Sequence, residues 1–322
     1  MGILDSTKAM TLAEAAKRQG YDSQAAVLGE LQKKNEFLDE VPFFPASHGS
    51  YHRYLKAKRL GKGDFSKINT GIPTITSGAD EMTEPITLYE GQSIVDSRIL
   101  DSVIDKTLVR DSEDILNLEG MFQDWMQGFI YQTGKIGSLK SLTERRVAID
   151  NLYTYSCGGT GSDLTSMWIF EFGEAGFHMR HNTSGSPGFS NEDKGLVYVP
   201  ASDGNGFMWA WLRLYKIYAA IVCRNERSLL RIANIESDGE TNNLIDTYNV
   251  ILKAKNQLQN VGRDAMGFVN RTVKAQIDIM AFNKQNGAFS VRDITGFGPI
   301  VSIAGLPIRM MEGITDTESE VA

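Results

Sequence analysis

The sequence predicts an α+β fold, and three observations support this prediction. The segment 112–132 has the spacing of an amphipathic helix, the segments 166–172 and 207–224 have the composition of strands, and 48–92 is typical of a charged β-hairpin. The apolar stripe of the helix consists of Ile115, Leu118, Phe122, Trp125 and Phe129. Such a helix is about 30 Å long and can be the backbone of a domain.

Composition excludes several classes of protein. The chain has 322 residues and a net charge of −7, so it can bury a core of its own and has no overall attraction to nucleic acid. Cys157 and Cys223 are too few for a disulfide scaffold, and we expect both to be small buried residues. The segment 1–18 lacks the apolar region of a signal peptide, and no apolar run approaches the roughly 20 residues of a membrane span. We therefore expect a protein made in the cytoplasm.

The first 40 residues are predicted to be helical and polar. Thr11 and Glu14 form a capping box, Gly20 ends that helix, and Asp22 can cap a second one. The apolar residues that follow, among them Phe37, are too sparse for a full core face. Such a segment is typical of an arm that packs on a partner.

The hairpin predicted over 48–92 changes the sign of its charge along its length. Its first part is basic and contains one acid, Asp64, whereas 80–90 is acidic. The cations are Arg53, Lys56, Lys58, Arg59, Lys62 and Lys67. Interleaved aromatic residues would suit nucleic acid, but a contact with acidic faces of other protein copies fits this acidic chain better. We therefore predict that these six residues contact a neighbouring subunit.

The remaining elements follow from local patterns. Acidic residues at Asp111, Glu113 and Asp114 suit the first turn of the long helix. Two further helices are expected over 240–261 and from Asn270 onward, and a strand hairpin at 299–311. The polar segment 182–205 predicts a surface excursion. By default, Trp125, Trp209 and Trp211 are expected in the core.

Sequence motifs for catalysis and metal binding are missing. The segment 128–135 departs from a phosphate-binding loop, because five residues separate its glycines and Ile136 replaces the required Ser or Thr. The glycines of 158–163 lack the strand-to-helix context. His178 and His181 have no nearby Cys or carboxylate at ligand spacing, and His48 and His52 suit solvated loops. We therefore expect no catalytic residues, no cofactor and no metal.

The order of these parts resembles the major capsid protein of tailed phages with the Hong Kong 97 fold, and local motifs resemble those of short-tailed phages. The resemblance extends from Glu36 to the end of the chain. After the long helix, 136–139 replaces the Phe-Asp-Gly-Leu segment that is frequent in that family. The matching motifs are 213–224, 230–235, 270–273 with 277–278, and 305–309 followed by Ile314 and Glu318.

The resemblance implies four regions. They are an N-terminal arm (1–47), an extended loop (48–92), a peripheral domain with a long spine helix (93–144 and 290–322) and an axial domain (145–289). It also implies a structural, non-enzymatic subunit that forms the pentamers and hexamers of an icosahedral head around double-stranded DNA. Alternatives are an encapsulin-like nanocompartment shell and an α/β enzyme with an unrecognised site.

The resemblance further implies partners and a location. The expected partners are other copies of the chain, a separate scaffolding protein, a portal protein, an optional cementing (decoration) protein, and packaged double-stranded DNA bound without sequence specificity; no membrane is involved. The protein would be assembled in the host cytoplasm and reside in the virion capsid.

The type member of the fold joins a loop lysine to an asparagine of a neighbour, with a buried carboxylate as base. Here no Asn follows Asn286, and Glu312, Glu318 and Glu320 are expected in an exposed tail. We therefore predict a shell without covalent cross-links.

Overall fold

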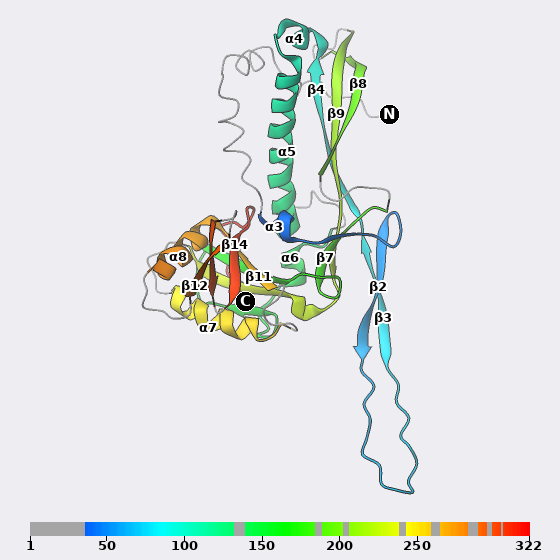
Figure 1. Cartoon of the computed structure of the whole chain (residues 1–322), viewed down its shortest axis with the longest axis vertical. Helices are drawn as coiled ribbons and strands as arrows, with labels where there is room; N and C mark the ends of the chain where they lie inside the picture. The colour runs from blue at the N-terminus through cyan, green and yellow to red at the C-terminus, as the bar shows by residue number, and fades with distance from the viewer. Residues whose placement is uncertain are drawn as a thin grey trace.

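The computed structural model describes residues 36–131, 139–183, 189–201, 206–237, 243–258, 265–282, 289–294, 298–303 and 305–322. The predicted capping box at Thr11, the end of the long helix at Gly134 and residues 136–138 lie outside these ranges. The described chain forms three parts: an elongated lobe around one long helix, a second lobe around a large sheet, and a narrow hairpin that projects from their junction (Figure 1).

The elongated lobe combines helix α5 (Lys106–Tyr131) with three antiparallel strands. Strand β9 (Phe207–Cys223) is central, with β4 (Thr87–Asp96) on one edge and β8 (Phe189–Pro200) on the other. The short helix α4 (Ser97–Ser102) connects β4 to α5 at the far end of the lobe (Figure 1). The strand and the helix approach closely at Gly91, where a Cβ atom would lie 2.9 Å from the Met121 sulfur.

Helix α5 begins six residues earlier than 112, the predicted start. The Asp105 side chain caps it and accepts a hydrogen bond from the Leu108 backbone N–H at 3.0 Å. The predicted placement of Asp111, Glu113 and Asp114 in the first turn was therefore wrong. Asp114 is buried and instead accepts hydrogen bonds from Arg213 and Tyr215 of β9, which fasten the helix to the sheet.

The second lobe contains a seven-stranded sheet in the order β12-β13-β14-β11-β6-β10-β5. Helices α7 (Asn243–Lys255) and α8 (Arg271–Phe282) contribute side chains to one core of this lobe, and the Asn270 side chain caps α8 by accepting from the Val273 N–H at 2.8 Å. The strands are β5 (Thr154–Ser156), β6 (Leu164–Glu171), β10 (Leu229–Glu236), β11 (Ala265–Val269), β12 (Phe289–Ile294), β13 (Gly298–Ile303) and β14 (Leu306–Met310).

Strand β6 is buried along its whole length because both faces of the sheet are covered. Met167 and Ile169 belong to the core with α7 and α8, whereas Trp168 and Phe170 belong to a second core with the end of α5. This alternation explains why the strand is a continuous apolar run.

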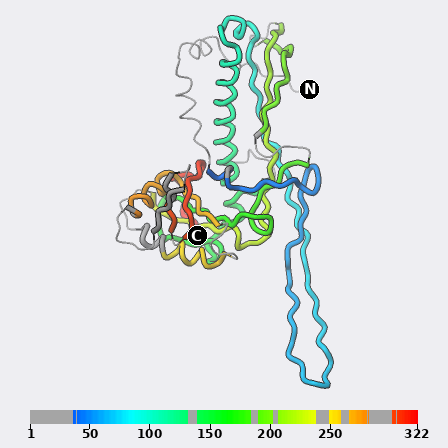
Figure 2. The backbone as a smooth tube through the Cα atoms, in the orientation of Figure 1, coloured from blue at the N-terminus to red at the C-terminus, as the bar shows by residue number. Residues whose placement is uncertain are grey.

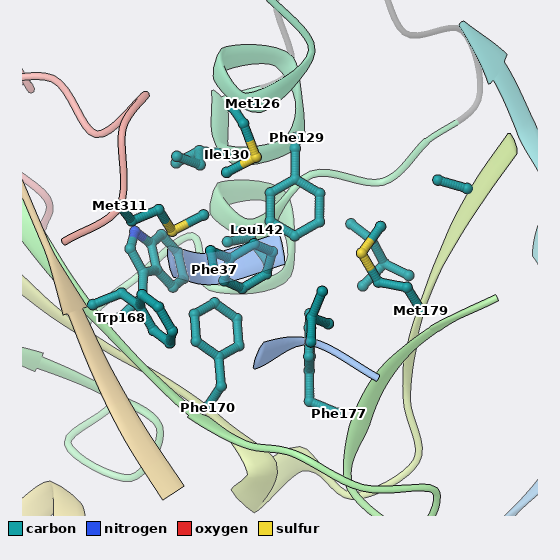
Figure 3. Packing of buried hydrophobic residues seen from close by; sticks show 14 of the residues in the cluster. Phe37, Met126, Phe129, Ile130, Leu142, Trp168, Phe170, Phe177, Met179 and Met311 are labelled. Carbon is teal, nitrogen blue, oxygen red and sulfur yellow. The ribbon is translucent and has the colours of Figure 1, made fainter. Parts of the chain in front are cut away.

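Phe37 lies in the middle of the second core (Figure 3). It belongs to helix α3 (Glu36–Glu40), and its ring centroid is 5.2–5.3 Å from those of Phe129, Phe170 and Phe268. Strand β1 (Phe43–Pro45) then pairs in parallel with β7 (Phe177–His181), which also pairs with the end of β9. The chain from 36 onward is thus part of the core, although the sequence suggested an arm up to residue 47.

The structure differs from the sequence interpretation in three further places. The predicted excursion at 182–205 contains β8, which is held by its ladder to β9. The sequence interpretation grouped 290–322 with the long helix. In the structure, strands β12 to β14 of this segment join the seven-stranded sheet, and Leu306 and Ile308 pack in the core with α7 and α8. Glu318 is buried and pairs with Arg231 at 2.9 Å, so this part of the tail is not exposed.

The two short helices α6 (Leu142–Arg145) and η2 (Glu226–Ser228) lie at the junction of the parts. The predicted terminal hairpin is confirmed, since β13 and β14 pair antiparallel around Gly305, whose φ is 80°. Of the helices in the described ranges, none is both long and apolar enough to cross a membrane.

Candidate intersubunit surface

The projecting hairpin consists of β2 (Tyr51–Arg59) and β3 (Gly78–Pro85), joined by the hairpin loop 60–77. It is shorter than the predicted 48–92, because the residues from Thr87 onward pair with β9. The loop extends away from both lobes, and every residue in it is exposed (Figure 2). Its turn is closed by a hydrogen bond from the Thr70 N–H to the Lys67 carbonyl at 3.2 Å, with Asn69 in the left-handed region.

The root of the hairpin packs on the body through alternate residues of β2. His52 and Tyr54 are buried on one face, while Arg53 and Leu55 point to solvent. The Tyr54 hydroxyl donates to the Cys223 carbonyl at 3.5 Å, and burial raises the pKa of Tyr54 above its usual value. The alternation ends beyond Ala57, where the hairpin leaves the body.

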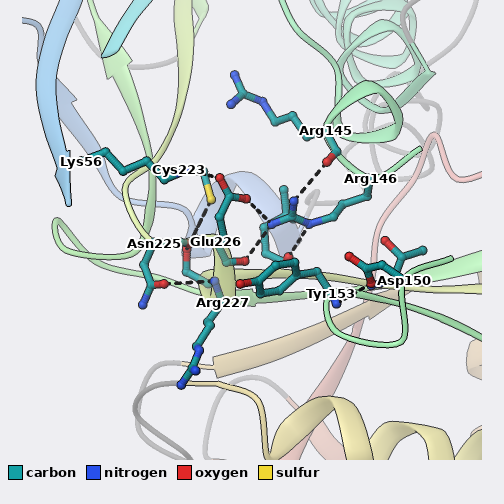
Figure 4. A network of polar contacts seen from close by, with 12 residues as sticks. Lys56, Arg145, Arg146, Asp150, Tyr153, Cys223, Asn225, Glu226 and Arg227 are labelled. Carbon is teal, nitrogen blue, oxygen red and sulfur yellow. Dashed lines mark hydrogen bonds and ion pairs between the residues drawn. The ribbon is translucent and has the colours of Figure 1, made fainter. Parts of the chain in front are cut away.

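Two groups of ion-paired side chains hold this root to the body. Arg145 of α6 donates to both carboxylate oxygens of Glu84 at 3.0 and 2.9 Å, and the two side chains are only 11% and 12% exposed. Lys56 and Arg146 both pair with Glu226, and the distance between the Arg146 guanidinium and the Glu226 carboxylate is 2.8 Å (Figure 4). Burial alone would raise the pKa of Glu226, but the hydrogen bonds from Lys56 and Arg146 outweigh it and lower that pKa.

The six predicted contact residues therefore divide into two groups. Four have partners within their own chain: Arg53 pairs with Glu81 at 3.2 Å, Lys56 with Glu226, Lys58 with Asp80 at 3.0 Å, and Arg59 donates to Thr76 at 2.7 Å. Lys62 and Lys67 lie on the exposed loop and form no ion pair with any described residue. Two of these ion pairs, Arg53–Glu81 and Lys58–Asp80, join β2 to β3.

Two histidines lie at the same root, and the expectation that His48 and His52 are both solvated was wrong for His52. Its ring is buried, and its Nδ1 accepts from the Ser47 N–H at 3.1 Å. His178 of β7 is fully buried. Burial, with the nearby guanidinium groups of Arg180 and Arg224, lowers the pKa of each histidine to about 4.

A second exposed surface lies at the far end of the elongated lobe. The strand register places Leu196 opposite Trp211, and Tyr198 opposite Trp209, so these side chains share one face. This aromatic face consists of Leu196, Tyr198, Phe207, Trp209 and Trp211.

The rings of the aromatic face pack on one another rather than on the body. The Tyr198 ring is 4.9 Å from Phe207 and 5.0 Å from Trp209, and all three side chains are more than half exposed. Trp211 is 37% exposed. The predicted core position is confirmed for Trp125 but was wrong for Trp209 and Trp211. Helix α5 contacts β9 from Trp211 onward: Arg110 donates to the Trp211 carbonyl at 3.1 Å, and Asp114 accepts from Arg213 and Tyr215.

Within the described ranges, no group of three or more His, Cys, Asp or Glu side chains could hold a metal ion. Cys157 and Cys223 are buried, as predicted, and burial raises the pKa of the Cys223 thiol. A thiol in that state is a poor nucleophile.

Solved capsids share this architecture. A chain in the structure of bacteriophage Epsilon15 matches with a TM-score of 0.70 and 22% identity, over 100% of this chain and 99% of that one. The capsid of bacteriophage JBD30 matches with a TM-score of 0.52 and 9% identity, over 91% and 94% of the two chains. The fold is that of the Hong Kong 97-like subunits that build phage capsids.

The family model for the major capsid protein GP7 matches residues 19–322, and the chain belongs to that family. It is therefore a structural protein of a phage capsid, which is built from many copies of such a subunit. No curated protein sequence matches the chain.

Proposed function

We propose that this capsid protein forms the pentamers and hexamers of an icosahedral head that encloses double-stranded DNA, and that it has no enzymatic activity. The observation that carries this proposal is the hairpin, which extends from the junction of the lobes and whose loop, 60–77, is exposed at every residue (Figure 1). An extended, exposed segment of this kind gains its contact area from another copy.

The hairpin is the proposed contact between subunits. Its root is held by two ion-paired groups, so the loop is presented at a fixed angle to the body. Lys62 and Lys67 are the cations that remain available for a neighbour. Arg53, Lys56, Lys58 and Arg59 instead shape the hairpin itself.

The proposal also covers the place where the shell is assembled and the partners of the protein. The protein is assembled in the host cytoplasm with a separate scaffolding protein and a portal protein, and it becomes part of the virion, with a decoration protein as an optional partner. Contacts with the packaged DNA would be without sequence specificity. The net charge of −7 suits a container for DNA, because a strongly basic inner wall would bind the DNA tightly and hinder its release.

Electron microscopy of the purified protein tests the proposal. We expect closed, hollow particles with five- and six-fold capsomers, alone or with scaffolding protein. A stable monomer or dimer under all assembly conditions would contradict it and would favour the alternative of an α/β enzyme. An encapsulin-like compartment shares the fold, and particles that take up an enzyme cargo in place of DNA would favour that alternative.

A further inference from the structure

A cluster of four basic side chains lies where the hairpin root meets β7 and the end of β9 (Figure 1). Three of them are almost fully buried, His52 and Arg180 at 6% exposed and His178 at 0%, and Arg224 is half-buried. Each has a buried nitrogen without a hydrogen-bond partner among the described residues: Nε2 of both histidines and Nε of both arginines. Buried polar atoms normally have partners, so four such atoms in one cluster indicate a ligand.

Hydrogen bonds hold the side chains of this basic cluster close together. The segment 45–47 donates to Nδ1 of His52 at 3.1 Å and accepts from Arg180 at 2.9 Å. Arg180 also donates to the Glu174 carboxylate at 3.3 Å, and the Glu174 backbone carbonyl accepts from Arg224 at 3.5 Å. These contacts bring the unpartnered nitrogens to one place at the hairpin root.

The basic cluster has more positive charge than its surroundings balance. Among the described residues, the two guanidinium groups form one ion pair, between Arg180 and Glu174, and the Glu174 side chain is 61% exposed. Burial beside both guanidinium groups lowers the pKa of each histidine to about 4, so the rings are neutral. Buried charge requires a partner, and an anion therefore suits this place.

The tautomers of the two histidines define the chemistry of that anion. Nδ1 of His52 accepts from a backbone N–H, so the neutral ring has its proton on Nε2 and can donate there. His178 lies two residues before Arg180 on the same face of β7, and its Nδ1 donates to the Gly173 carbonyl at 3.1 Å. Its neutral Nε2 can therefore only accept. The basic cluster thus offers three donors and one acceptor, which match a ligand with several acceptor oxygens and one hydroxyl.

We propose that the basic cluster binds one hydrogen phosphate ion, whose oxygens accept from His52 and the two arginines and whose hydroxyl donates to His178. Sulfate has a similar shape but no hydroxyl at neutral pH, so one of its oxygens meets the lone pair of Nε2. The phosphodiester groups of nucleic acid lack the hydroxyl as well. The bound ion connects β2 to β7 and to the end of β9, and it thereby holds the hairpin root to the body.

Equilibrium dialysis of the unassembled chain against radiolabelled phosphate or sulfate tests the proposal. At pH 7 we expect one phosphate per chain, bound about tenfold more tightly than sulfate, because one charge-assisted hydrogen bond distinguishes the two ions. Arg224→Gln should weaken the binding of phosphate about tenfold for the same reason. Arg227→Gln, at an exposed arginine three residues further along, is the matched control and should leave the binding unchanged.

The preference for phosphate should depend on the proton of His178. The positive groups that oppose this proton are Arg180, Arg224 and His52; at His52, protonation is also opposed by His48 and favoured by Glu174. A bound anion offsets the positive charge, so at pH 5 Nε2 of His178 can take up a proton and donate to sulfate. The difference between the two ions should therefore shrink at pH 5. His178→Gln, whose amide can donate or accept, should remove the difference at pH 7 and still bind phosphate.

Equal affinity of the parent chain for phosphate and sulfate at pH 7, or no saturable binding of either, would overturn the proposal. Displacement of bound phosphate by an oligonucleotide without terminal phosphates would overturn it as well. If Arg224→Gln does not fold, hydrogen exchange of the parent chain replaces it. Phosphate, but not sulfate, should then slow the exchange of the backbone amides of 51–54, and unchanged exchange would contradict a link between β2 and the body.

Discussion

The ion pair between Glu84 and Arg145 holds the hairpin to the body through two parallel hydrogen bonds. Replacing Glu84 by Gln removes the charge but keeps the shape, and leaves a mostly buried guanidinium with a weaker partner. We expect the free energy of unfolding of the monomer to fall by about 1.5–3 kcal/mol, measured by denaturant unfolding. The matched control is Glu81→Gln on the same strand, whose pair with Arg53 is about half exposed, and a loss of about 0.2–1 kcal/mol is expected there. Equal losses would show that burial of the pair is unimportant.

His52 and His178 make the hairpin root sensitive to acid. An unfolded histidine takes up a proton near pH 6.5, whereas these two remain neutral in the folded chain until about pH 4. Between these values protons bind only to the unfolded state, so stability is complete above pH 6.5 and decreases as the pH falls toward 4. Protonation of either ring would add charge beside Arg180 and Arg224; at His52 it is also opposed by His48 and favoured by Glu174.

The measurement is the unfolding midpoint between pH 7 and pH 4. His178→Gln should reduce the slope of the midpoint against pH, because it removes one of the two groups whose pKa is lowered in the folded chain. A slope that is the same in the parent and in His178→Gln would contradict this account.

At the scale of elements, the hairpin has two parts: a root that packs on the body of its own chain, and an exposed loop that can contact other copies. Replacing Lys62 and Lys67 together by Glu should lower the yield of particles, because it reverses the charge that an acidic neighbour would meet. The monomer should keep its unfolding midpoint, since neither side chain pairs with a described residue. Particle yield is measured by sedimentation and stability by denaturant unfolding of the unassembled chain.

The control for this experiment is Lys56→Glu. This side chain pairs with Glu226 at the root, so the substitution should destabilise the monomer itself. Normal particle yield from the Lys62 and Lys67 variant would remove the loop cations from the contact.

Elements whose pattern is local could be predicted from the sequence. The stripe of α5, the cap at Asn270 and the apolar run of β6 each depend on neighbours a few residues away. The root contacts could not be predicted, because Glu84 and Arg145 are 61 residues apart and Lys56 and Glu226 are 170 apart. The exposure of Trp209 could not be predicted either. The alternation along β9 shows which residues share a face of the strand, but it does not show where α5 stops covering that face.

For the whole molecule, we predict a shell without covalent cross-links. Lys62 and Lys67 are exposed on the loop, but no Asn follows Asn286 in the returning strands. Glu318 is buried, contrary to the expected exposed tail, yet it accepts hydrogen bonds from Tyr131, Ser166 and Arg231 and lies in the body, away from the loop. Because the Glu318 carboxylate already accepts these hydrogen bonds and is distant from the loop, it cannot act as the base for a loop lysine of its own chain.

Boiling mature particles in detergent and reducing agent should release a single band near 35.6 kDa. A ladder that survives this treatment would show that an acceptor outside the returning strands is used.

Strands β3 and β4 are separated by a single residue, Ile86, and form one extended run from 78 to 96 that is about 60 Å long. It joins the hairpin to the α4 end of the elongated lobe (Figure 2). Tension applied at the loop by a neighbour would travel along this run into the ten-residue ladder between β4 and β9. The hydrogen bonds of that ladder lie across the direction of pull, so the load is carried in shear by all of them together instead of opening them one at a time. Each subunit can thus act as a tensile strut against pressure from within.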